Sequence, residues 1–341
     1  MTRAGFLKFS AALAAATVLT AGLARADNPK MIIYVSPNPL GVNEFLKMGK
    51  TGTNEVAKAL GAKARTYEAK DPTTRKQDVE AAVHDGADIV VVLGFEFNDI
   101  IPEAAKKNPN TKFLIVDQFI DKPPPNVWES VFREWEGAYL AGAEAALVSK
   151  NGKVGSVAAL DIPFLHRWTD AFADGAKAAR PDITVLPTLI VGGDNAFSDP
   201  VRAEQQAQAM IAGGADVIFG VAAGGNGGVF KAAKDRGVLA IGVDANQCPS
   251  QPGAVLDNMV KHVDKALKNA VEGMVKGGQP QIVAYGLKEG GVGLTAFDPG
   301  LAKSQCEIAK HPDVIAKVKV IADKIESGEI KLSDPMLNPK K

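Results

Sequence analysis

The chain has 341 residues, with 39 basic and 39 acidic side chains and a formal net charge of zero. A nucleic-acid-binding surface needs a basic patch or stripe, and the lack of any long basic run argues against nucleic acid as a partner. The two cysteines and four histidines are not arranged at the spacing of metal ligands, so the sequence predicts no metal site. A chain of this length is expected to form two domains of about 150 residues each.

Residues 1–26 have the three-part pattern of a secretory signal peptide. Arg3 and Lys8 give a positive start, Phe9 to Leu23 form an apolar run, and Ala24-Arg25-Ala26 offers a cleavage site. The run is too short for a membrane-spanning helix, and no later stretch reaches about 18 uninterrupted apolar residues. No cysteine lies near the cleavage site to carry a lipid anchor. We therefore expect a free periplasmic protein.

After this segment, short β-rich runs alternate with amphipathic helices. The run Ile89–Leu93 is apolar throughout, as is typical of a strand buried on both faces of a parallel sheet. Strands are expected at 31–35, 64–68, 89–93 and 113–116, and helices at 43–60, 73–85 and 99–107.

The alternation continues in the second half of the chain, so the fold class expected is α/β with doubly wound parallel sheets. The helices expected there are 135–150, 263–276 and 313–327, and the strands are 153–158, 183–191, 217–221, 239–243 and 282–285.

An internal repeat predicts two similar lobes. Residues 77–118 resemble residues 205–247 at an offset of about 128 residues, although α/β units can also share such patterns by chance. We expect lobe I to contain 29–133 plus 257–289, and lobe II to contain 134–256 plus 290–336. A chain that crosses several times between lobes forms a hinge, and a hinge between two lobes forms a cleft.

The residues after the expected strands predict a ligand site, because ligands of open parallel sheets sit beyond the carboxyl ends of the strands. Aromatic faces can sandwich a flat ring, carboxylates accept hydrogen bonds from hydroxyl or ring N–H groups, and glycines let backbone N–H groups approach closely. The alternatives are that the aromatics belong to the core and the carboxylates cap loops. The candidate ligand residues are Asn43, Phe45, Phe95, Asp117, Asp161, Phe197, Gly224, Gly225 and Asp244.

Motifs of enzymes and cofactor sites are missing. The sequence has neither a G-x-S-x-G elbow nor an H-E-x-x-H pair. The cluster from Gly224 to Gly228 lacks the Gly-Lys-Ser/Thr of a P-loop and the third glycine of the dinucleotide fingerprint. We therefore expect a binding protein without catalytic residues, cofactor or metal.

Cys248 and Cys306 are exported with the chain, and an oxidising compartment would permit a disulfide between them. Their separation in the sequence gives no geometry. Two separate buried thiols remain the alternative at this point.

Five stretches together resemble one known family, the basic membrane protein or purine-nucleoside-receptor-like (PnrA-like) substrate-binding proteins of ABC transporters. The resemblance covers essentially the whole chain after the signal peptide. It implies a type I periplasmic-binding fold with two lobes and three crossovers, and a nucleoside or nucleobase-like ligand that is passed to an ABC permease in the inner membrane. The stretches are Phe132 to Lys150 (FREWEGAYLAGAEAALVSK), Gly152 to Pro163 (GKVGSVAALDIP), Gly214 to Lys234 (GADVIFGVAAGGNGGVFKAAK), Ile241 to Gln247 (IGVDANQ) and Tyr285 to Leu294 (YGLKEGGVGL).

The resemblance also implies roles for single residues. Phe45 matches the aromatic residue that stacks on the base, and Asp117 matches the acidic residue that ends the fourth strand. Asp244 matches the acidic residue that holds ribose hydroxyls. Lys288 matches a lysine at a position that varies in the family, and Phe197 lies in the segment that resembles the lobe II aromatic segment.

One departure leaves the ligand open. Family members often carry an aspartate before the first aromatic, and Gly41 stands at that place here. Asn43 or Glu44 can supply the lost polar contact. We expect a monomer that closes around a small flat polar ligand. The alternatives are an envelope sensor of the same fold, a binding protein for a sugar or another non-purine ligand, and an enzyme with a small α/β cleft.

Overall fold

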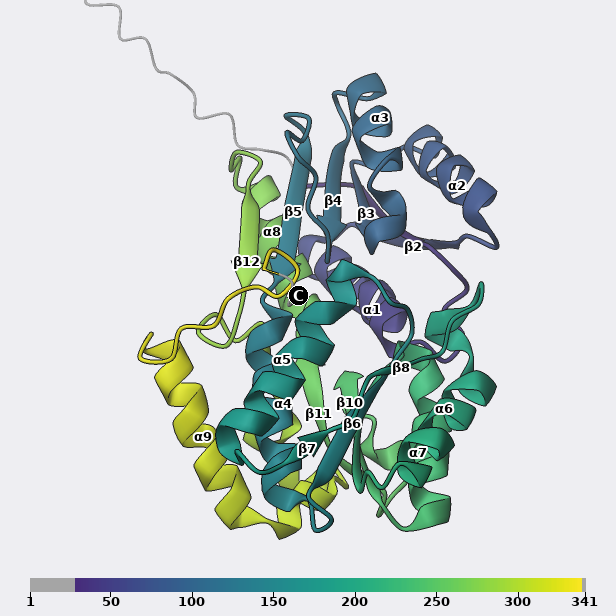
Figure 1. The fold of residues 1–341 in the computed structure, drawn as a ribbon. Helices are drawn as coiled ribbons and strands as arrows, with labels where there is room; N and C mark the ends of the chain where they lie inside the picture. Colours follow the sequence, from purple (N-terminus) through teal and green to yellow (C-terminus); the bar gives the residue numbers. More distant parts are fainter. Residues whose placement is uncertain (1–27, 339–341) are drawn as a thin grey trace, which may run out of the picture.

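The computed structural model describes residues 28–338, which form two α/β lobes stacked end to end (Figure 1). The predicted signal peptide lies outside the described residues. Within 28–338, no helix is both long enough and apolar enough to cross a membrane. The fold is the predicted α/β class with parallel sheets.

Lobe I is built on a sheet in which all neighbouring strands are parallel, in the order β12-β5-β4-β3-β1-β2. Every residue of the central strand β3 is buried, as its unbroken apolar run predicts. The strands are β1 (Met31–Ser36), β2 (Lys63–Glu68), β3 (Ile89–Leu93), β4 (Lys112–Val116), β5 (Val127–Phe132) and β12 (Ile282–Tyr285); the helices are α1 (Glu44–Leu60), α2 (Pro72–His84), α3 (Ile100–Lys107) and α8 (Val263–Val275).

Lobe II repeats this plan with the strand order β13-β11-β10-β9-β6-β7, while β8 also pairs with β6. Among its described strands only β13 is antiparallel to its neighbour. The strands are β6 (Lys153–Ala158), β7 (Thr184–Val185), β8 (Leu189–Ile190), β9 (Val217–Val221), β10 (Leu239–Asp244), β11 (Val255–Lys261) and β13 (Val292–Leu294); the helices are α4 (Glu134–Val148), α5 (Pro163–Ala179), α6 (Pro200–Ala212), α7 (Asn226–Arg236) and α9 (Pro312–Glu326).

The chain crosses between the lobes three times, after β5, after β11 and between β12 and β13. The second crossing corrects the boundary expected at 257, because β11 pairs with β10 and belongs to lobe II. The sequence hid this strand because Asp257 and Asn258 interrupt its apolar pattern, although both residues are buried. The expected strand 183–191 is likewise two short strands, β7 and β8.

Two glycines let helices α4 and α5 cross in close contact inside lobe II. A methyl group on Gly142 would lie 1.9 Å from the carbonyl oxygen of Phe172, and one on Gly175 would lie 1.9 Å from that of Tyr139. Any larger residue would push the helices apart. This contact makes α4 and α5 a rigid support for the residues at the start of each helix, which face the waist between the lobes.

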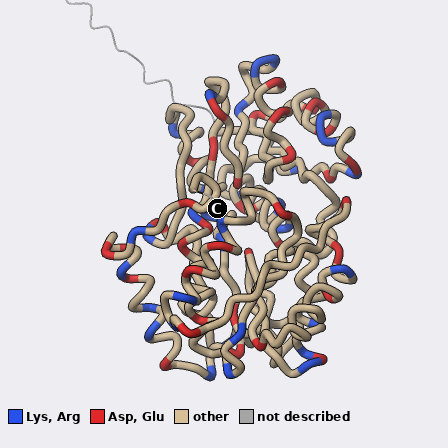
Figure 2. Tube along the Cα trace, viewed as in Figure 1, with Lys and Arg blue, Asp and Glu red and all other residues tan. Residues whose placement is uncertain are grey.

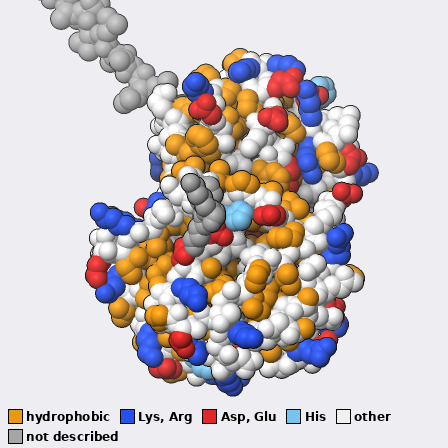
Figure 3. All heavy atoms as spheres, viewed as in Figure 1, with side chains coloured by type: hydrophobic (Ala, Val, Ile, Leu, Met, Phe, Trp, Pro, Cys, Tyr) orange, Lys and Arg blue, Asp and Glu red, His pale blue; other side chains and the backbone are white. Residues whose placement is uncertain are grey.

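Basic and acidic residues are interspersed along the trace of both lobes (Figure 2), in keeping with the formal net charge of zero. In the space-filling view the two lobes meet at a constricted waist (Figure 3).

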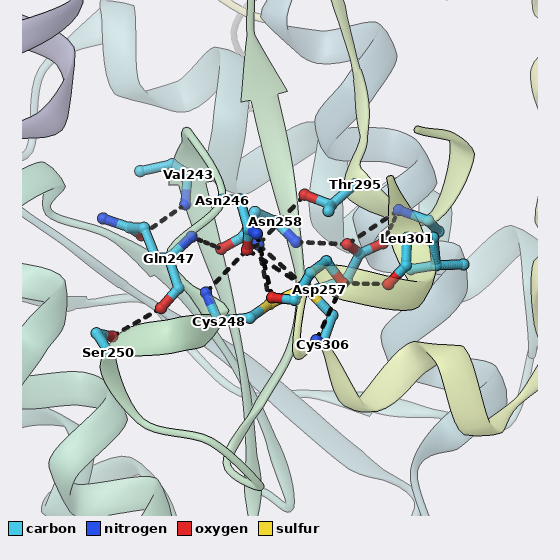
Figure 4. The surroundings of a disulfide bond; sticks show 12 residues. Val243, Asn246, Gln247, Cys248, Ser250, Asp257, Asn258, Thr295, Leu301 and Cys306 are labelled. Carbon is cyan, nitrogen blue, oxygen red and sulfur yellow. Dashed lines mark hydrogen bonds between the residues drawn. A yellow bond between two sulfur atoms is a disulfide. The ribbon is translucent and has the colours of Figure 1, made fainter. Parts of the chain in front are cut away.

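Cys248 and Cys306 form a disulfide, which decides between the two alternatives left open by the sequence (Figure 4). The bridge ties the loop after β10 to the segment that precedes α9, 58 residues further along the chain. The Asn258 amide nitrogen donates to the Cys248 sulfur at 3.1 Å, and Asn246 Oδ1 accepts from the Cys248 backbone N–H at 3.0 Å. The loop that follows Asp244 is therefore fixed covalently.

Candidate ligand-binding site

A cleft lies at the waist, where the carboxyl ends of the two sheets face one another. It contains about 630 Å³ of empty space, its open mouth included. Its walls come from both lobes: Pro37, Asn38, Asn43, Phe45, Leu46, Leu93, Gly94, Phe95, Glu96 and Asp117 from lobe I, and Phe164, Leu165, Trp168, Phe197, Val221, Ala223, Val243, Asp244 and Lys261 from lobe II.

Two aspartates occupy equivalent places in the two lobes. Asp117 follows β4 and Asp244 ends β10, and each has a φ of 71°. The left-handed conformation is unfavourable for a residue with a side chain, and such strain persists mainly where function requires it. Both residues are buried and both line the cleft. The backbone thus turns both carboxylates to the same space from opposite sides.

Lys261 connects the two lobes electrostatically. It is the last residue of β11 in lobe II, and its side chain is 2% exposed. Its Nζ lies 2.7 Å from Asp117 Oδ1 in lobe I and 3.4 Å from Glu134 Oε1 at the start of α4. Burial alone would lower the pKa of Lys261, but the carboxylates of Asp117, Glu134 and Asp244 raise it above its usual value. Lys261 is therefore a permanent cation of the cleft.

Aromatic rings surround this ammonium group. The ring centroids of Phe45, Trp168, Phe132 and Phe164 lie 5.0, 5.1, 5.2 and 5.7 Å from Lys261 Nζ. A cation within about 6 Å of an aromatic face is attracted by the ring, and more strongly when water is excluded. The rings therefore help to hold Lys261 in place. Within the described chain the Trp168 indole N–H has no hydrogen-bond partner, so it remains available as a donor.

Asp244, unlike Asp117, is not paired with Lys261. It makes no hydrogen bond or ion pair with a described residue, and burial raises its pKa to about 6, with Lys261 lowering it and Asp117 raising it further. An isolated buried carboxylate is costly unless something donates to it. The site thus holds one acceptor that the protein itself leaves unused.

The two lobes touch across the cleft. The rings of Phe95 in lobe I and Phe197 in lobe II lie 6.3 Å apart. At the rim, a methyl group on Gly224 would lie 3.0 Å from Val42 Cγ2 and 3.2 Å from the Asn43 backbone nitrogen. The lobes are therefore in contact at the cleft in this structure, and Gly224 leaves the space for this approach.

A second layer of charges lies behind Lys261. Arg167 of α5 holds Asp334 with its Nη2 atom 2.6 Å from Oδ2, and its Nη1 atom lies 3.4 Å from Glu134 Oε2. Asp334 belongs to the segment after α9, which returns to the waist (Figure 1). The chain of charges Asp334–Arg167–Glu134–Lys261–Asp117 therefore runs from the C-terminal segment to the cleft.

The first and third crossings are also bound to each other. Arg133 donates to Glu136 at 2.6 Å and to Glu289 at 2.5 Å, and Glu136 accepts from the Leu287 backbone N–H at 2.8 Å. These bonds fix the two crossings relative to one another.

The structure brings six of the predicted ligand residues together on the cleft wall and separates four from it. Gly224 and Gly225 form a turn beside the cleft, next to Ala223, which lines it. Asp161 is 73% exposed and lies in a side pocket, where it contacts His166 at 3.1 Å. Lys288 is exposed on the third crossing. The six residues on the wall are Asn43, Phe45, Phe95, Asp117, Phe197 and Asp244.

Sequence reasoning missed Glu96, Phe164, Trp168 and Lys261, which also line the cleft. Phe164 and Trp168 stand four residues apart at the start of α5, so one turn of helix presents both rings on the same side. That spacing could have predicted that both rings line the cleft. Nothing in the sequence indicated a role for Lys261, because the strand that carries it was not predicted.

Two lobes with parallel sheets, three crossings and a cleft between the strand ends define the type I periplasmic-binding fold, the architecture of solute-binding proteins. Among the described residues, no cluster of His, Cys, Asp and Glu side chains is arranged to hold a metal ion.

The chain belongs to the family described as ABC transporter substrate-binding protein PnrA-like, whose family model matches residues 32–331. It is 30% identical to the ABC transporter nucleoside-binding protein BmpA of Lactococcus lactis over 88% of each chain, and 31% identical to the CD4+ T-cell-stimulating antigen of Listeria monocytogenes over 76% of this chain and 74% of that one. A solved solute-binding protein from Aeropyrum pernix is similar with a TM-score of 0.78 and 26% identity, over 90% of this chain and 94% of the other. Members of this family bind solutes for ABC transporters and are not enzymes.

Proposed function

We propose that the chain captures a nucleoside or a nucleobase-like ligand in the periplasm and delivers it to an ABC permease in the inner membrane. The observation that carries this proposal is the pair Asp117 and Asp244, held in the same strained conformation on opposite walls of an aromatic cleft. A relative with 30% identity is named as nucleoside-binding, which supports the same ligand class. The predicted signal peptide, without a cysteine at its end, supports a free periplasmic protein, and we propose that it acts as a monomer.

A ring with a sugar attached matches the chemistry of the walls. Phe45, Phe95 and Phe197 offer aromatic faces for the flat ring. The Asp244 carboxylate, which has no partner of its own, accepts from sugar hydroxyl groups. The Lys261 ammonium group and the Trp168 indole N–H donate to the oxygens of the ligand.

Capture by closure follows from the division of these groups between the lobes. Phe45 and Asp117 act from lobe I, and Phe197 and Asp244 act from lobe II. A ligand that contacts both sets stabilises the closed arrangement by its differential affinity for that state. The Lys261–Asp117 ion pair also joins the lobes at 2.7 Å, so the cleft is preorganised on its hinge side.

Titration calorimetry with guanosine, adenosine, uridine, the free bases and free ribose tests this proposal. We expect at least one nucleoside to bind at least about 10-fold more tightly than ribose, because the ring adds stacking and hydrogen bonds of about 1.4 kcal/mol or more. If ribose or another pentose binds as tightly as every nucleoside, the protein is a sugar-binding member of the fold. Fractionation of the expressing cells tests the periplasmic location.

A further inference from the structure

Glu96 places a second carboxylate without an ion-pair partner among residues 28–338 on the lobe I wall of the cleft. It follows β3 in a short 3-10 turn, Phe95–Phe97, and lines the cleft together with Pro37 and Asn38. Its neighbour Phe95 supplies the ring that faces Phe197. The same turn therefore contributes one aromatic face and one acceptor to the ligand space.

Gly94 gives this carboxylate its position. Gly94 has a φ of 97°, a conformation that favours glycine. A methyl group there would lie 2.5 Å from Glu96 Oε2. The carboxylate thus folds back over the α-carbon of Gly94, and a larger residue at this position would displace it.

No cation within residues 28–338 neutralises Glu96. Its only hydrogen bond within the described chain is to its own backbone N–H, and burial raises its pKa despite the opposing influence of Arg75. The Arg75 guanidinium is occupied elsewhere, with Nε donating to the Pro37 carbonyl at 2.8 Å and Nη2 donating to Asn38 Oδ1 at 3.1 Å. Glu96 differs in this from Asp117, which has Lys261 at 2.7 Å.

The charged groups of the cleft determine which hydrogen-bond donors a ligand needs. Three carboxylates, Asp117, Asp244 and Glu96, line it together with one cation, Lys261. Asp117 and Asp244 are buried and Glu96 is half-buried. A carboxylate that loses water is destabilising unless other groups donate to it, and an ionised carboxylate can only accept hydrogen bonds. A ligand is therefore favoured when it carries donors at two ends, hydroxyl groups for Asp244 and N–H groups for Glu96.

We propose that Glu96 reads the ring edge of the ligand and selects a heterocycle with two adjacent N–H donors, as guanine has at N1 and N2. A carboxylate accepts two parallel N–H bonds from such an edge, and charge assistance makes these bonds strong. The ring itself lies against Phe95, so stacking and edge recognition come from neighbouring residues. This inference rests on the proposed function, because it assumes that the cleft holds a nucleoside or nucleobase.

The test is calorimetry of the wild type and Glu96→Gln with guanosine and 1-methylguanosine, in which a methyl group replaces the N1 hydrogen. We expect the wild type to bind guanosine at least about 10-fold more tightly than 1-methylguanosine, because the methylated edge leaves the carboxylate without its donor. Glu96→Gln should lose this preference by weakening guanosine binding alone. Glu80→Gln, which removes an exposed carboxylate from the same lobe, is the charge-matched control and should keep the preference.

The possible failures are distinct. If the wild type binds no nucleoside or base, the proposed function and this inference both fall. If the wild type binds nucleosides but Glu96→Gln weakens guanosine and 1-methylguanosine equally, or neither, the inference alone is overturned. Unfolding temperatures of both variants, measured without ligand, show whether a lost preference comes from misfolding.

Discussion

Asp117 and Asp244 stand at the same point of the internal repeat, with the same backbone conformation, and yet their surroundings differ. In lobe I the Asp117 carboxylate has a buried lysine at 2.7 Å. In lobe II no residue within 28–338 donates to the Asp244 carboxylate, and burial raises its pKa to about 6. The repeat thus places both aspartates in a backbone turn with the same φ. They differ because Lys261, which lies outside the repeat, forms an ion pair with Asp117.

This difference distinguishes a pair that stabilises the protein, Asp117 and Lys261, from a residue that is free to bind ligand, Asp244. The Asp117–Lys261 pair joins the lobes, so Asp117 contributes to stability as well as to the wall of the cleft. Asp244 is costly to the empty protein and becomes satisfied when a ligand donates to it. Changes at the first pair should therefore act mainly on stability, and changes at Asp244 mainly on binding.

The largest expected effect is on stability, at Lys261. Lys261→Met leaves Asp117 and Glu134 buried without their cation, and removal of one partner of a buried ion pair costs about 3–5 kcal/mol. Urea unfolding measures this loss. Lys268→Met removes an exposed lysine of α8 and should cost less than about 0.5 kcal/mol. Equal stability of the two variants would contradict the supporting role of Lys261.

The disulfide sharpens the comparison because only the loop after Asp244 is covalently fixed. The double variant Cys248→Ser, Cys306→Ser should lose about 2–4 kcal/mol of unfolding free energy, since the bridge spans 58 residues. A reductant should destabilise the wild type by the same amount and leave the double variant unchanged. A wild type that is indifferent to reductant would show that the bridge contributes nothing.

Binding should respond most strongly at Asp244. Asp244→Asn keeps a residue type that tolerates the left-handed conformation, so it removes the charge with little backbone strain. We expect nucleoside affinity to fall about 100-fold, about 2.7 kcal/mol, as measured by calorimetry. Asp161→Asn is the matched control, because Asp161 also follows a lobe II strand but lies outside the cleft; its affinity should stay within about 2-fold. Equal losses in both variants would remove the distinction.

A third arrangement of buried carboxyl groups, in lobe II, gives the smallest predicted effect. Glu144 of α4 and Asp257 of β11 are both buried and interact with each other, and burial raises the pKa of each above its usual value. A carboxyl whose pKa is raised by folding stabilises the protein at low pH, and this stability is lost as pH rises through the raised pKa. The unfolding temperature of the wild type should therefore fall between pH 5 and pH 8.

Glu144→Gln should flatten this dependence, because a neutral amide donates to Asp257 at every pH. We expect the variant to be more stable than the wild type at pH 8 by on the order of 1 kcal/mol, and not at pH 5. Thermal unfolding at the two pH values measures the difference. Parallel pH curves for the two proteins would show that the pair does not share a proton.

The sequence predicted the two α/β lobes because their strands and helices follow from the periodic pattern of apolar residues. Buried runs such as Ile89–Leu93 indicated parallel strands, and the repeat marked Asp117 and Asp244 as equivalent. It did not predict β11, because Asp257 and Asn258 are buried polar residues within that strand. Asp161 resembled Asp117 in following a strand, but the end of its strand, β6, is directed to a side pocket.

The chemistry of the site depends on contacts that no local pattern contains. Lys261 meets Asp117 from 144 residues away, and Arg167 meets Asp334 from 167 residues away. Such pairs form only when crossings bring distant segments together. Glu96 was not among the candidates for a related reason, since its proposed role depends on the backbone conformation of Gly94 and on the hydrogen bonds that engage Arg75 with Pro37 and Asn38, neither of which is visible in the sequence.

A crystal structure of the protein with guanosine tests the central claim most directly. The account predicts a ring against Phe45, Phe95 or Phe197, and sugar hydroxyl groups within about 3.2 Å of the Asp244 carboxylate. Both lobes should contact the same molecule. A ligand bound to one lobe alone, or outside the cleft, with no hydrogen bond to the Asp244 carboxylate, would contradict it.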